Sequence, residues 1–450
     1  MHQWTKICLW GILVAVVPCG CTESIPSDHG AFEAWVSDRA LPIKSLETSF
    51  SGKEIESLRE MVGAARVVGL GESRHDTREQ LLLKGLLTRH LIEDQGFRAL
   101  IIEESFSHAA RLDQYVTSGK GDPRALMNRL AGWYLWDTEE MLELVQWIRQ
   151  FNEDREPGQK VHIFGMDITA PALGVQDVMN ALADAGVKTH LDAQSLGLDL
   201  QRGDFWPTTW ERYAALSDDR KKELAENYDA LTTLVKVEKT RLMAFSSRQA
   251  YERMARLAEI GKQGNAMFSS ASREEGGAIR ERGMAQAVLW ILDQAMAGSH
   301  AIVWSHNLHV ARSTFRMPGL AEGTLTPMGA HLSDSLGDAY LAIGGTFGTG
   351  SYGADLPPGA RMFEAVPEDV LDGALSQVGM TNFLVDRCAA ASHSKAAQWL
   401  QKDREMRAQD TRVWLVPGKA FDWLYFVKEI TRAQPTPLAL RRFQSLGTQH

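Results

Sequence analysis

Short apolar runs recur along the chain, and stretches in which apolar residues have helical spacing separate them. The runs are Val67–Leu70, Ala99–Glu103, Val161–Phe164, Ala301–Ser305, Tyr340–Ile343, Phe383–Val385, Val413–Val416 and Leu424–Val427. Several are apolar throughout, which is typical of strands covered by helices on both faces. Leucines at helical spacing from Leu82 to Leu91 predict a helix that ends near Gly96. The pattern predicts an α/β fold with a central, mainly parallel sheet flanked by helices.

Residues 167 to 298 lack such runs. Apolar residues there follow helical spacing, as in Leu224, Tyr228, Leu231 and Leu234 and again in Tyr251, Met254, Leu257 and Ile260. We predict a helical insertion over the carboxyl edge of the sheet, either a lid or a helical subdomain without a gating role. The expected segments are a leader (1–21), a tether and leading helix (22–60), the first half of the core (61–166), the insertion (167–298), the second half of the core (299–430) and a loose tail (431–450).

The first candidate site follows the apolar run Val67–Leu70. Glu72 and His75 lie in the short turn that comes next, and Asp76 with Glu79 has the D-x-x-E form of an N-terminal capping box. Open α/β sheets bind ligands at the carboxyl ends of their strands. We therefore expect this turn to deliver a carboxylate and an imidazole to a ligand site, the alternative being a helix cap with a solvated histidine.

A second run, Ala301–Ser305, leads directly into His306 and His309. Two strand ends that both carry histidine are better explained by one shared crevice than by two independent structural histidines. The two segments are therefore expected to face each other across a single site.

These segments resemble the erythromycin esterase family. The resemblance runs from residue 60 to residue 430 through ordered blocks, namely Gly71–His75, Ala99–Glu103, Trp147–Asn152, Phe164–Asp167, Arg280–Ala285, Trp304–His309, Pro327–Leu332 and Lys419–Leu424. Two positions depart from the family pattern. Lys84 stands nine residues after His75, where antibiotic-inactivating members usually carry arginine, so a two-pronged contact becomes a point charge. Glu104 follows Glu103 in place of a small residue and adds an acidic group.

No signature of a nucleophilic serine or of a phosphate cradle is present. The chain has no G-x-S-x-G elbow, and Ser351 lacks the first glycine of that motif. The glycine-rich segment Gly344–Gly350 lacks the Lys and Ser/Thr ending of a P-loop. We interpret it as backbone that approaches a ligand closely or as a flexible turn.

Hydrolysis by this chain is therefore expected to proceed by direct attack of water. His75 is the candidate general base, because a neutral imidazole accepts protons near working pH. Glu72 is expected to fix the tautomer of that imidazole, and Glu103 to do the same or to hold the water. His306 on the opposite wall is expected to stabilise the oxyanion or to protonate the leaving alkoxide.

Cationic side chains complete the candidate site. Lys84 and Arg280 are expected to stabilise the oxyanion or to pair with the carboxylates, while Arg280, His309 and His331 are the candidate substrate-binding residues. The resemblance implies the same functional set, which is Glu72, His75, Lys84, Glu103 and His306. It also implies a carboxylic ester or a macrocyclic lactone as substrate, with macrolide ring-opening as the family's best-known reaction, and no cofactor.

Two other classes of function stay open at this point. A metal-dependent hydrolase would use carboxylate and imidazole ligands, from the set His75, Glu103, His306, His309 and His331. A non-catalytic surface lipoprotein would hold a cationic or polyol ligand in the same acidic, histidine-rich cleft. The resemblance does not choose the ester, because one fold and site serve many substrates.

Composition narrows the list of partners. The chain has 450 residues, of which 44% are hydrophobic, enough for a sizeable core. Its formal net charge of -9 argues against nucleic acid as a partner, because phosphate binding needs a basic face. The expected partner is a small-molecule ester or lactone, and the sequence does not indicate an oligomeric state.

The N-terminus is typical of an exported bacterial protein. Lys6 precedes an apolar stretch from Cys8 to Val17, and Cys21 stands where a lipoprotein signal ends, although a cleaved secretory signal or an uncleaved anchor would share these features. We predict a cell-envelope lipoprotein whose membrane contact is a lipid on Cys21. Outside the leader the one cysteine is Cys388, so no intramolecular disulfide can form there, and we interpret Cys388 as a packed thiol.

Overall fold

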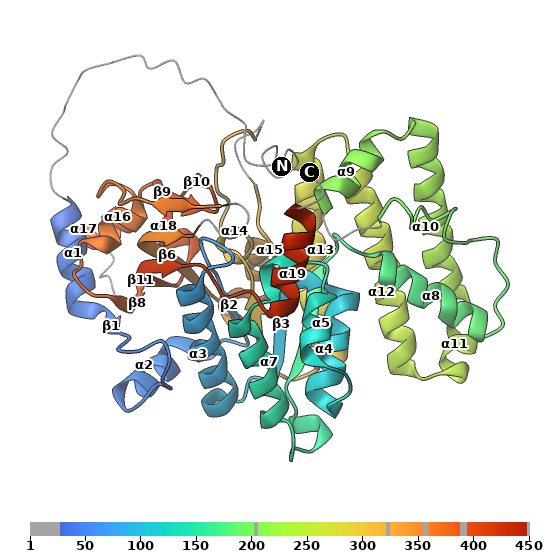
Figure 1. Ribbon diagram of the computed structural model, residues 1–450, viewed down its shortest axis with the longest axis horizontal. Helices are drawn as coiled ribbons and strands as arrows, with labels where there is room; N and C mark the ends of the chain where they lie inside the picture. The colour runs from blue at the N-terminus through green and yellow to red at the C-terminus, as the bar shows by residue number, and fades with distance from the viewer. Residues whose placement is uncertain (1–27, 202–205, 321–324, 354–358, 388–393, 448–450) are drawn as a thin grey trace.

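Nine described strands form a single sheet, and two more form a separate hairpin (Figure 1). The computed structural model describes residues 28–447 except 202–205, 321–324, 354–358 and 388–393. The predicted leader with Cys21 and the cysteine Cys388 lie outside these residues. The strands are β1 Leu41–Pro42, β2 Val67–Leu70, β3 Ala99–Ser105, β4 His162–Asp167, β5 Ala301–Trp304, β6 Tyr340–Tyr352, β7 Arg361–Phe363, β8 Asn382–Asp386, β9 Arg404–Ala408, β10 Thr411–Leu415 and β11 Trp423–Thr431.

The strand order explains how distant segments meet. The sheet runs β1-β8-β11-β6-β2-β5-β3-β4, with β7 paired to β6, while β9 and β10 form the hairpin. The neighbours from β11 to β4 are all parallel, and β8, β1 and β7 are antiparallel to their partners. The predicted mainly parallel sheet is confirmed. Because β2 lies next to β5, and β5 next to β3, the three strand ends with candidate site residues are adjacent.

Helices cover both faces of this sheet. They are α1 Asp28–Arg39, α2 Lys53–Val62, α3 Arg78–Gln95, α4 Phe106–Ser118, α5 Pro123–Asn128, α6 Trp133–Trp136, α7 Glu139–Phe151, α8 Ala172–Asp184, α9 Trp206–Ala214, α10 Asp218–Val237, α11 Lys239–Phe245, α12 Arg248–Ser269, α13 Arg273–Trp290, α14 Asn307–Val310, α15 Met328–Leu336, α16 Leu371–Ser376, α17 Lys395–Leu400, α18 Pro417–Ala420 and α19 Pro437–Gly447, with short turns η1 Pro157–Gln159, η2 Ile291–Ala295 and η3 Gly337–Ala339. None of these described helices combines the length and apolar character that a membrane span requires.

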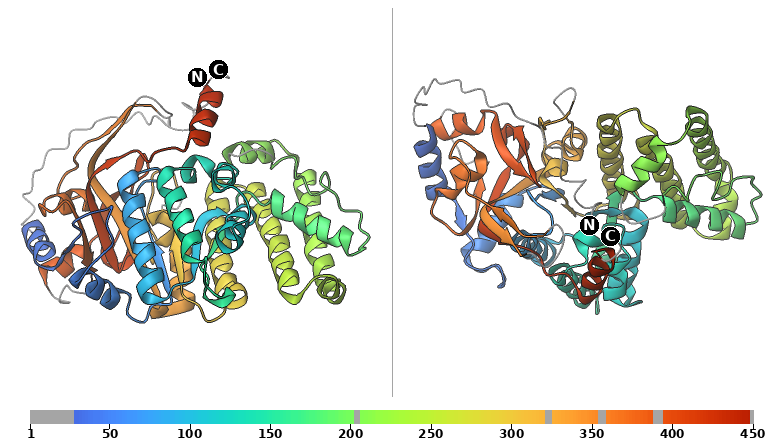
Figure 2. Two further views of the ribbon diagram at one scale, coloured as in Figure 1. Left: turned by 60° about the horizontal axis from the view of Figure 1, so that its bottom comes forward. Right: turned by 45° about the horizontal axis from the view of Figure 1, so that its top comes forward.

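Alternation along the strands separates two cores. Val68 of β2 packs in a core with α2, α3 and α7, whereas Val67 packs in the core on the other face with α8, α12, α13 and α15. Both residues are fully buried. The views of Figures 1 and 2 agree that α8 and α10–α12 stand beside the β4 end of the sheet. Most of the helical insertion, residues 167–298, therefore extends the sheet sideways.

Two local predictions are corrected by the structure. The glycine-rich segment Gly344–Gly350 is not a turn but the middle of β6, where a Cβ on Gly345 would lie 1.9 Å from the Tyr425 ring. The predicted loose tail contains helix α19, whose Phe443 is buried against the Trp133 ring. The segment predicted as a tether and leading helix contains α1, which is held by tertiary packing of its apolar side chains.

Candidate active site

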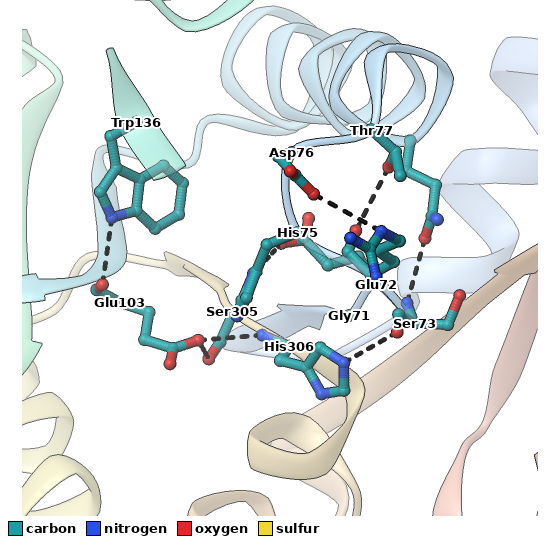
Figure 3. Close-up of polar contacts among 12 residues, drawn as sticks. Gly71, Glu72, Ser73, His75, Asp76, Thr77, Glu103, Trp136, Ser305 and His306 are labelled. Atoms are coloured by element: carbon teal, nitrogen blue, oxygen red, sulfur yellow. Dashed lines mark hydrogen bonds and ion pairs between the residues drawn. The ribbon is translucent and has the colours of Figure 1, made fainter. Parts of the chain in front are cut away.

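The turn between β2 and α3, residues 71–77, carries the first two candidate residues and is called the catalytic turn below. It starts at Gly71, where a Cβ would lie 2.3 Å from the Asn307 side-chain oxygen. Only glycine therefore fits where the ends of β2 and β5 meet. This close approach places the side chains of Glu72 and His75 beside the polar residues that follow β5 (Figure 3).

The predicted capping box does not form in this turn. The N-cap of α3 is Thr77, without a side-chain cap hydrogen bond, and Asp76 has a left-handed backbone with φ of 57°. The Asp76 carboxylate instead accepts a hydrogen bond from the Tyr352 hydroxyl at 3.1 Å. Glu79 accepts from the backbone and hydroxyl of Thr431. Partners from distant strands thus replace the local cap. The predicted helix end is confirmed, since Gly96 is the left-handed C-cap.

Glu72 holds an imidazole with one oxygen and an ammonium with the other. Its Oε1 lies 2.6 Å from His75 Nδ1, and its Oε2 accepts from Lys84 Nζ at 2.7 Å. Lys84 also donates to the Ser305 carbonyl at 3.2 Å and lies over the Trp304 ring. The Glu72 and Lys84 side chains are buried, whereas 15% of the His75 side chain is exposed. His75 is therefore the member of this group that a solvent molecule can reach.

The charges of Glu72 and Lys84 depend on each other. Burial raises the pKa of Glu72, but the Lys84 ammonium and the hydrogen bond from His75 outweigh it, so the pKa lies below its ordinary value. Burial lowers the pKa of Lys84 to about 8, against the opposing attraction of Glu72. At neutral pH the carboxylate is ionised and aimed at His75.

Glu103, at the end of β3, organises the opposite wall. Its Oε2 accepts from the Ser305 hydroxyl at 2.6 Å and from the His306 backbone N–H at 3.1 Å. Its Oε1 accepts from Arg280 Nη2 at 2.8 Å and lies 3.1 Å from His309 Nε2. One carboxylate thereby ties together β3, β5, α13 and α14.

Arg280 and His309 have further acidic partners. Arg280 makes a two-pronged contact with Asp167, Nε to Oδ1 at 3.1 Å and Nη2 to Oδ2 at 2.7 Å. His309 Nδ1 lies 2.6 Å from one oxygen of Glu281, whose other oxygen accepts from the Met328 backbone at 2.7 Å. The acidic partners hold both cationic side chains at the ends of strands β3 to β5.

Oppositely charged neighbours keep Glu103, His309 and Arg280 ionised. Burial raises the pKa of Glu103, but His309 and Arg280 lower it to well below its ordinary value. Burial lowers the pKa of His309, yet Glu103 and Glu281 raise it to about 10. Arg280 likewise has a raised pKa, because Asp167 and Glu103 outweigh burial. His309 is thus an imidazolium at neutral pH, in contrast to His306.

His306 is a neutral imidazole with both nitrogens engaged. Its Nε2 donates to the Ser73 carbonyl at 2.9 Å, and its Nδ1 accepts from the Leu308 N–H at 3.1 Å, which caps α14. Burial, followed by the nearby His75 and His309, lowers its pKa to about 3. Its ring stands 5.2 Å from the His75 ring. Neither nitrogen can reach a substrate unless one of these hydrogen bonds breaks.

Glu104 turns away from the reacting groups. It accepts hydrogen bonds from three backbone N–H groups, those of Ser105, Ala131 and Gly132. Burial raises its pKa to about 8. The next helix contributes Trp136, whose indole donates to the Glu103 carbonyl at 3.2 Å (Figure 3). Glu104 therefore fixes the loop before α6, which in turn supports the Glu103 strand end.

Comparison with known proteins identifies the family. The sequence profile described as Erythromycin esterase matches residues 92–430, well over half of the chain. This protein belongs to the erythromycin esterase family. The resemblance seen in the sequence is thus confirmed, and membership supports a hydrolase of that type. The profile match begins after Glu72, His75 and Lys84, so the roles of these three rest on their geometry and on the resemblance of their motif.

Relatives agree with this family over most of their length. The chain is 25% identical to an erythromycin esterase type II of Escherichia coli over 79% of this chain and 88% of the relative. A crystal structure of a Bacillus cereus protein superposes with a TM-score of 0.76, at 24% identity, covering 91% of this chain and all of that one. An erythromycin esterase mutant in its open conformation has a TM-score of 0.70, at 21% identity, covering 86% and 97%. These structures share the fold.

Of the predicted site residues of this family member, the structure gathers seven and leaves one apart. The seven are Glu72, His75, Lys84, Glu103, Arg280, His306 and His309. His331 lies in α15, and among the described residues no hydrogen bond or ion pair joins its side chain to them. Sequence reasoning missed Asp167, Glu281 and Ser305, although Asp167 and Ser305 both stand at strand ends.

The carboxylates of the site are already occupied by cations and hydrogen-bond donors. Among the described residues, no three His, Cys, Asp or Glu side chains are arranged to hold one metal ion. The predicted set His75, Glu103, His306, His309 and His331 is spread over both walls and α15, rather than converging on a point.

Proposed function

We propose that this protein hydrolyses a carboxylic ester or a macrocyclic lactone by direct attack of a water molecule that His75 activates. The observation that carries the proposal is the 2.6 Å contact between His75 Nδ1 and the buried, ionised Glu72. A carboxylate can only accept, so the proton of His75 resides on Nδ1 and the lone pair on Nε2. Nε2 is then the basic atom, on the one partly exposed side chain of the group.

The proposed hydrolysis consists of the addition of water and the loss of the alkoxide. The water oxygen bonds to the carbonyl carbon while its proton moves to His75 Nε2, and Glu72 stabilises the resulting imidazolium. We assign stabilisation of the tetrahedral oxyanion to the positively charged side chains of Arg280 and His309, which share their wall of the site with the carboxylates of Glu103, Asp167 and Glu281. The bond to the leaving oxygen then breaks, and the imidazolium returns its proton to the alkoxide. Acid and alcohol are released, or one hydroxy acid in the case of a lactone.

The available hydroxyl groups support water as the nucleophile. The Ser305 hydroxyl donates to Glu103, an acceptor that does not remove its proton at neutral pH because that carboxyl has a pKa far below the ordinary range. The Ser73 hydroxyl is buried and has no hydrogen-bond partner. Neither hydroxyl is bonded to an imidazole that would activate it.

The macrolide class of substrate is part of the proposal, because the family relative in Escherichia coli is an erythromycin esterase. The test uses residues 22–450, with erythromycin and p-nitrophenyl acetate as substrates. Loss of a general base lowers turnover by about 10²–10⁴-fold. We expect His75→Ala to show such a loss with an unchanged fold, and His331→Ala, outside the network, to keep normal turnover.

A folded native protein that turns over neither substrate, but binds erythromycin, would favour a ligand-binding role instead.

The predicted export and lipid attachment at Cys21 complete the proposal. Globomycin-sensitive processing of the full-length chain in bacteria would support them, and a cytoplasmic, unprocessed chain would contradict them.

A further inference from the structure

The β9–β10 hairpin contacts the catalytic turn. The backbone N–H of Gln409 donates to the Ser73 carbonyl at 2.8 Å. The same carbonyl accepts from His306 Nε2 at 2.9 Å. Both lone pairs of this fully buried carbonyl oxygen are therefore used, one by the Gln409 N–H of the hairpin and one by His306. Ser73, the residue after Glu72, is held between the hairpin and α14.

Arg74 links the same two elements through its side chain. Only 4% of this side chain is exposed, and its Nη1 donates to Asp410 Oδ1 at 2.7 Å. Its Nε donates to the Tyr352 hydroxyl at 3.1 Å. The guanidinium lies 5.0 Å from the Tyr352 ring centre and 4.9 Å from the Phe363 ring centre. A planar guanidinium can satisfy all these partners at once, which a lysine ammonium cannot.

The residue on the other side of His75 is also held in place. Asp76 has the left-handed backbone noted above, which is strained for a residue other than glycine. Tyr352 donates to its carboxylate at 3.1 Å, and the Ala433 N–H donates to its carbonyl at 2.8 Å. His75 is thus flanked by Arg74 and Asp76, and both depend on distant parts of the chain.

We propose that Asp410 and Arg74 are positioning residues, through which the β9–β10 hairpin keeps the catalytic turn in the conformation that places His75 against Glu72. The catalytic consequence rests on the proposed function of His75. Neither residue contacts Glu72 or His75 side chains directly. Their effect is geometric, because a flanking residue that rotates would lengthen the 2.6 Å contact between His75 and Glu72.

Asp410 is suited to a test because its removal leaves no buried void. Its side chain is 40% exposed, lines a cavity of about 390 Å³ and also pairs with Arg361. Arg74 keeps Tyr352 and Asp76 as partners when Asp410 is replaced. A matched control exists in the same hairpin, where Glu405 pairs with Arg412 and does not touch the catalytic turn.

The first measurement is steady-state kinetics with erythromycin. Small misplacements of a catalytic group cost up to about 10²-fold in rate. We expect Asp410→Ala to lower kcat by about 10- to 100-fold, with KM nearly unchanged. Asp410→Asn keeps an acceptor oxygen for Arg74 and should restore most of the loss. Glu405→Gln should behave as the native protein.

The second measurement does not depend on activity. A proton in a 2.6 Å contact between an imidazole and a carboxylate is strongly deshielded, so His75 Nδ1–H should give a far-downfield signal in ¹H NMR of the histidine-labelled protein. His75→Ala assigns this signal by removing it. We expect the signal to move upfield or broaden in Asp410→Ala, and to stay unchanged in Glu405→Gln.

Two results would overturn the inference. One is an unchanged His75 signal in a folded Asp410→Ala protein, and the other is a lower melting temperature with normal kcat, which would make the contact purely structural. If the native protein hydrolyses neither erythromycin nor p-nitrophenyl acetate, the proposed function fails, but the NMR comparison still decides whether the hairpin positions His75.

Discussion

Replacement of Lys84 by methionine tests the electrostatic design of the site most directly. Lys84→Met keeps the length of the side chain and removes the ammonium that lies 2.7 Å from Glu72. Among the described residues, Glu72 then keeps His75 as its one side-chain partner, at a position where burial raises the pKa of Glu72. The carboxyl should therefore take up a proton at a higher pH than in the native protein.

The magnitude follows from the burial of both groups. The loss of one partner from a buried ion pair costs about 3–5 kcal/mol. Because about 1.4 kcal/mol corresponds to one pH unit, a loss of about 3 kcal/mol moves the acid limb of kcat/KM upward by about two pH units. A protonated Glu72 no longer stabilises the imidazolium, so turnover decreases at pH values below that of the acid limb.

The free energy of unfolding of Lys84→Met should also depend on the protonation of Glu72. In the variant the folded-state pKa of Glu72 lies above that of the unfolded chain, so the destabilisation is present at neutral pH and shrinks as the pH falls and Glu72 is protonated. Urea unfolding at neutral and at acidic pH measures this difference. Methionine avoids the cost of burying an ammonium, which offsets part of the loss.

Arginine at this position is the matched control. The pKa of Lys84 is about 8, so native activity should decline above that pH as the ammonium loses its proton. Lys84→Arg stays charged and should retain substantial activity while its alkaline limb moves to higher pH. Full activity and an unchanged acid limb in Lys84→Met would refute the argument and make Lys84 a structural residue of α3.

Two further predictions concern the metal and His306. If His75 activates water without a metal, exhaustive chelation should leave kcat unchanged, whereas loss of activity that one added metal restores would favour the metal-dependent alternative. His306→Ala removes one of the two hydrogen bonds to the buried Ser73 carbonyl, at a cost of about 0.5–1.5 kcal/mol, and should lower kcat. Because the pKa of His306 is about 3, neither limb of the pH–rate profile should move, and a shifted limb would show that His306 exchanges protons during turnover.

The amino-acid sequence alone was sufficient where signals are local. Buried strands such as β2 and β5 appear as short apolar runs, and the end of α3 appears as Gly96. Glu72 and His75 are three residues apart in a turn, so their contact follows from local geometry. The same apolar runs predict a mainly parallel sheet, but they do not give the strand order that places β2, β5 and β3 side by side.

Tertiary structure decided the features that depend on residues far apart in the chain. Asp76 has the sequence of a helix cap but pairs with Tyr352, because a distant partner in a buried site outweighs a local hydrogen bond. Gly345 belongs to a segment that looks like a turn but forms β6, and a Cβ at this position would collide with the Tyr425 ring. The contact of Arg74 with Asp410 spans 336 residues and has no counterpart in any local pattern. Local spacing predicts which side chains share an element, whereas packing between elements determines which of them meet.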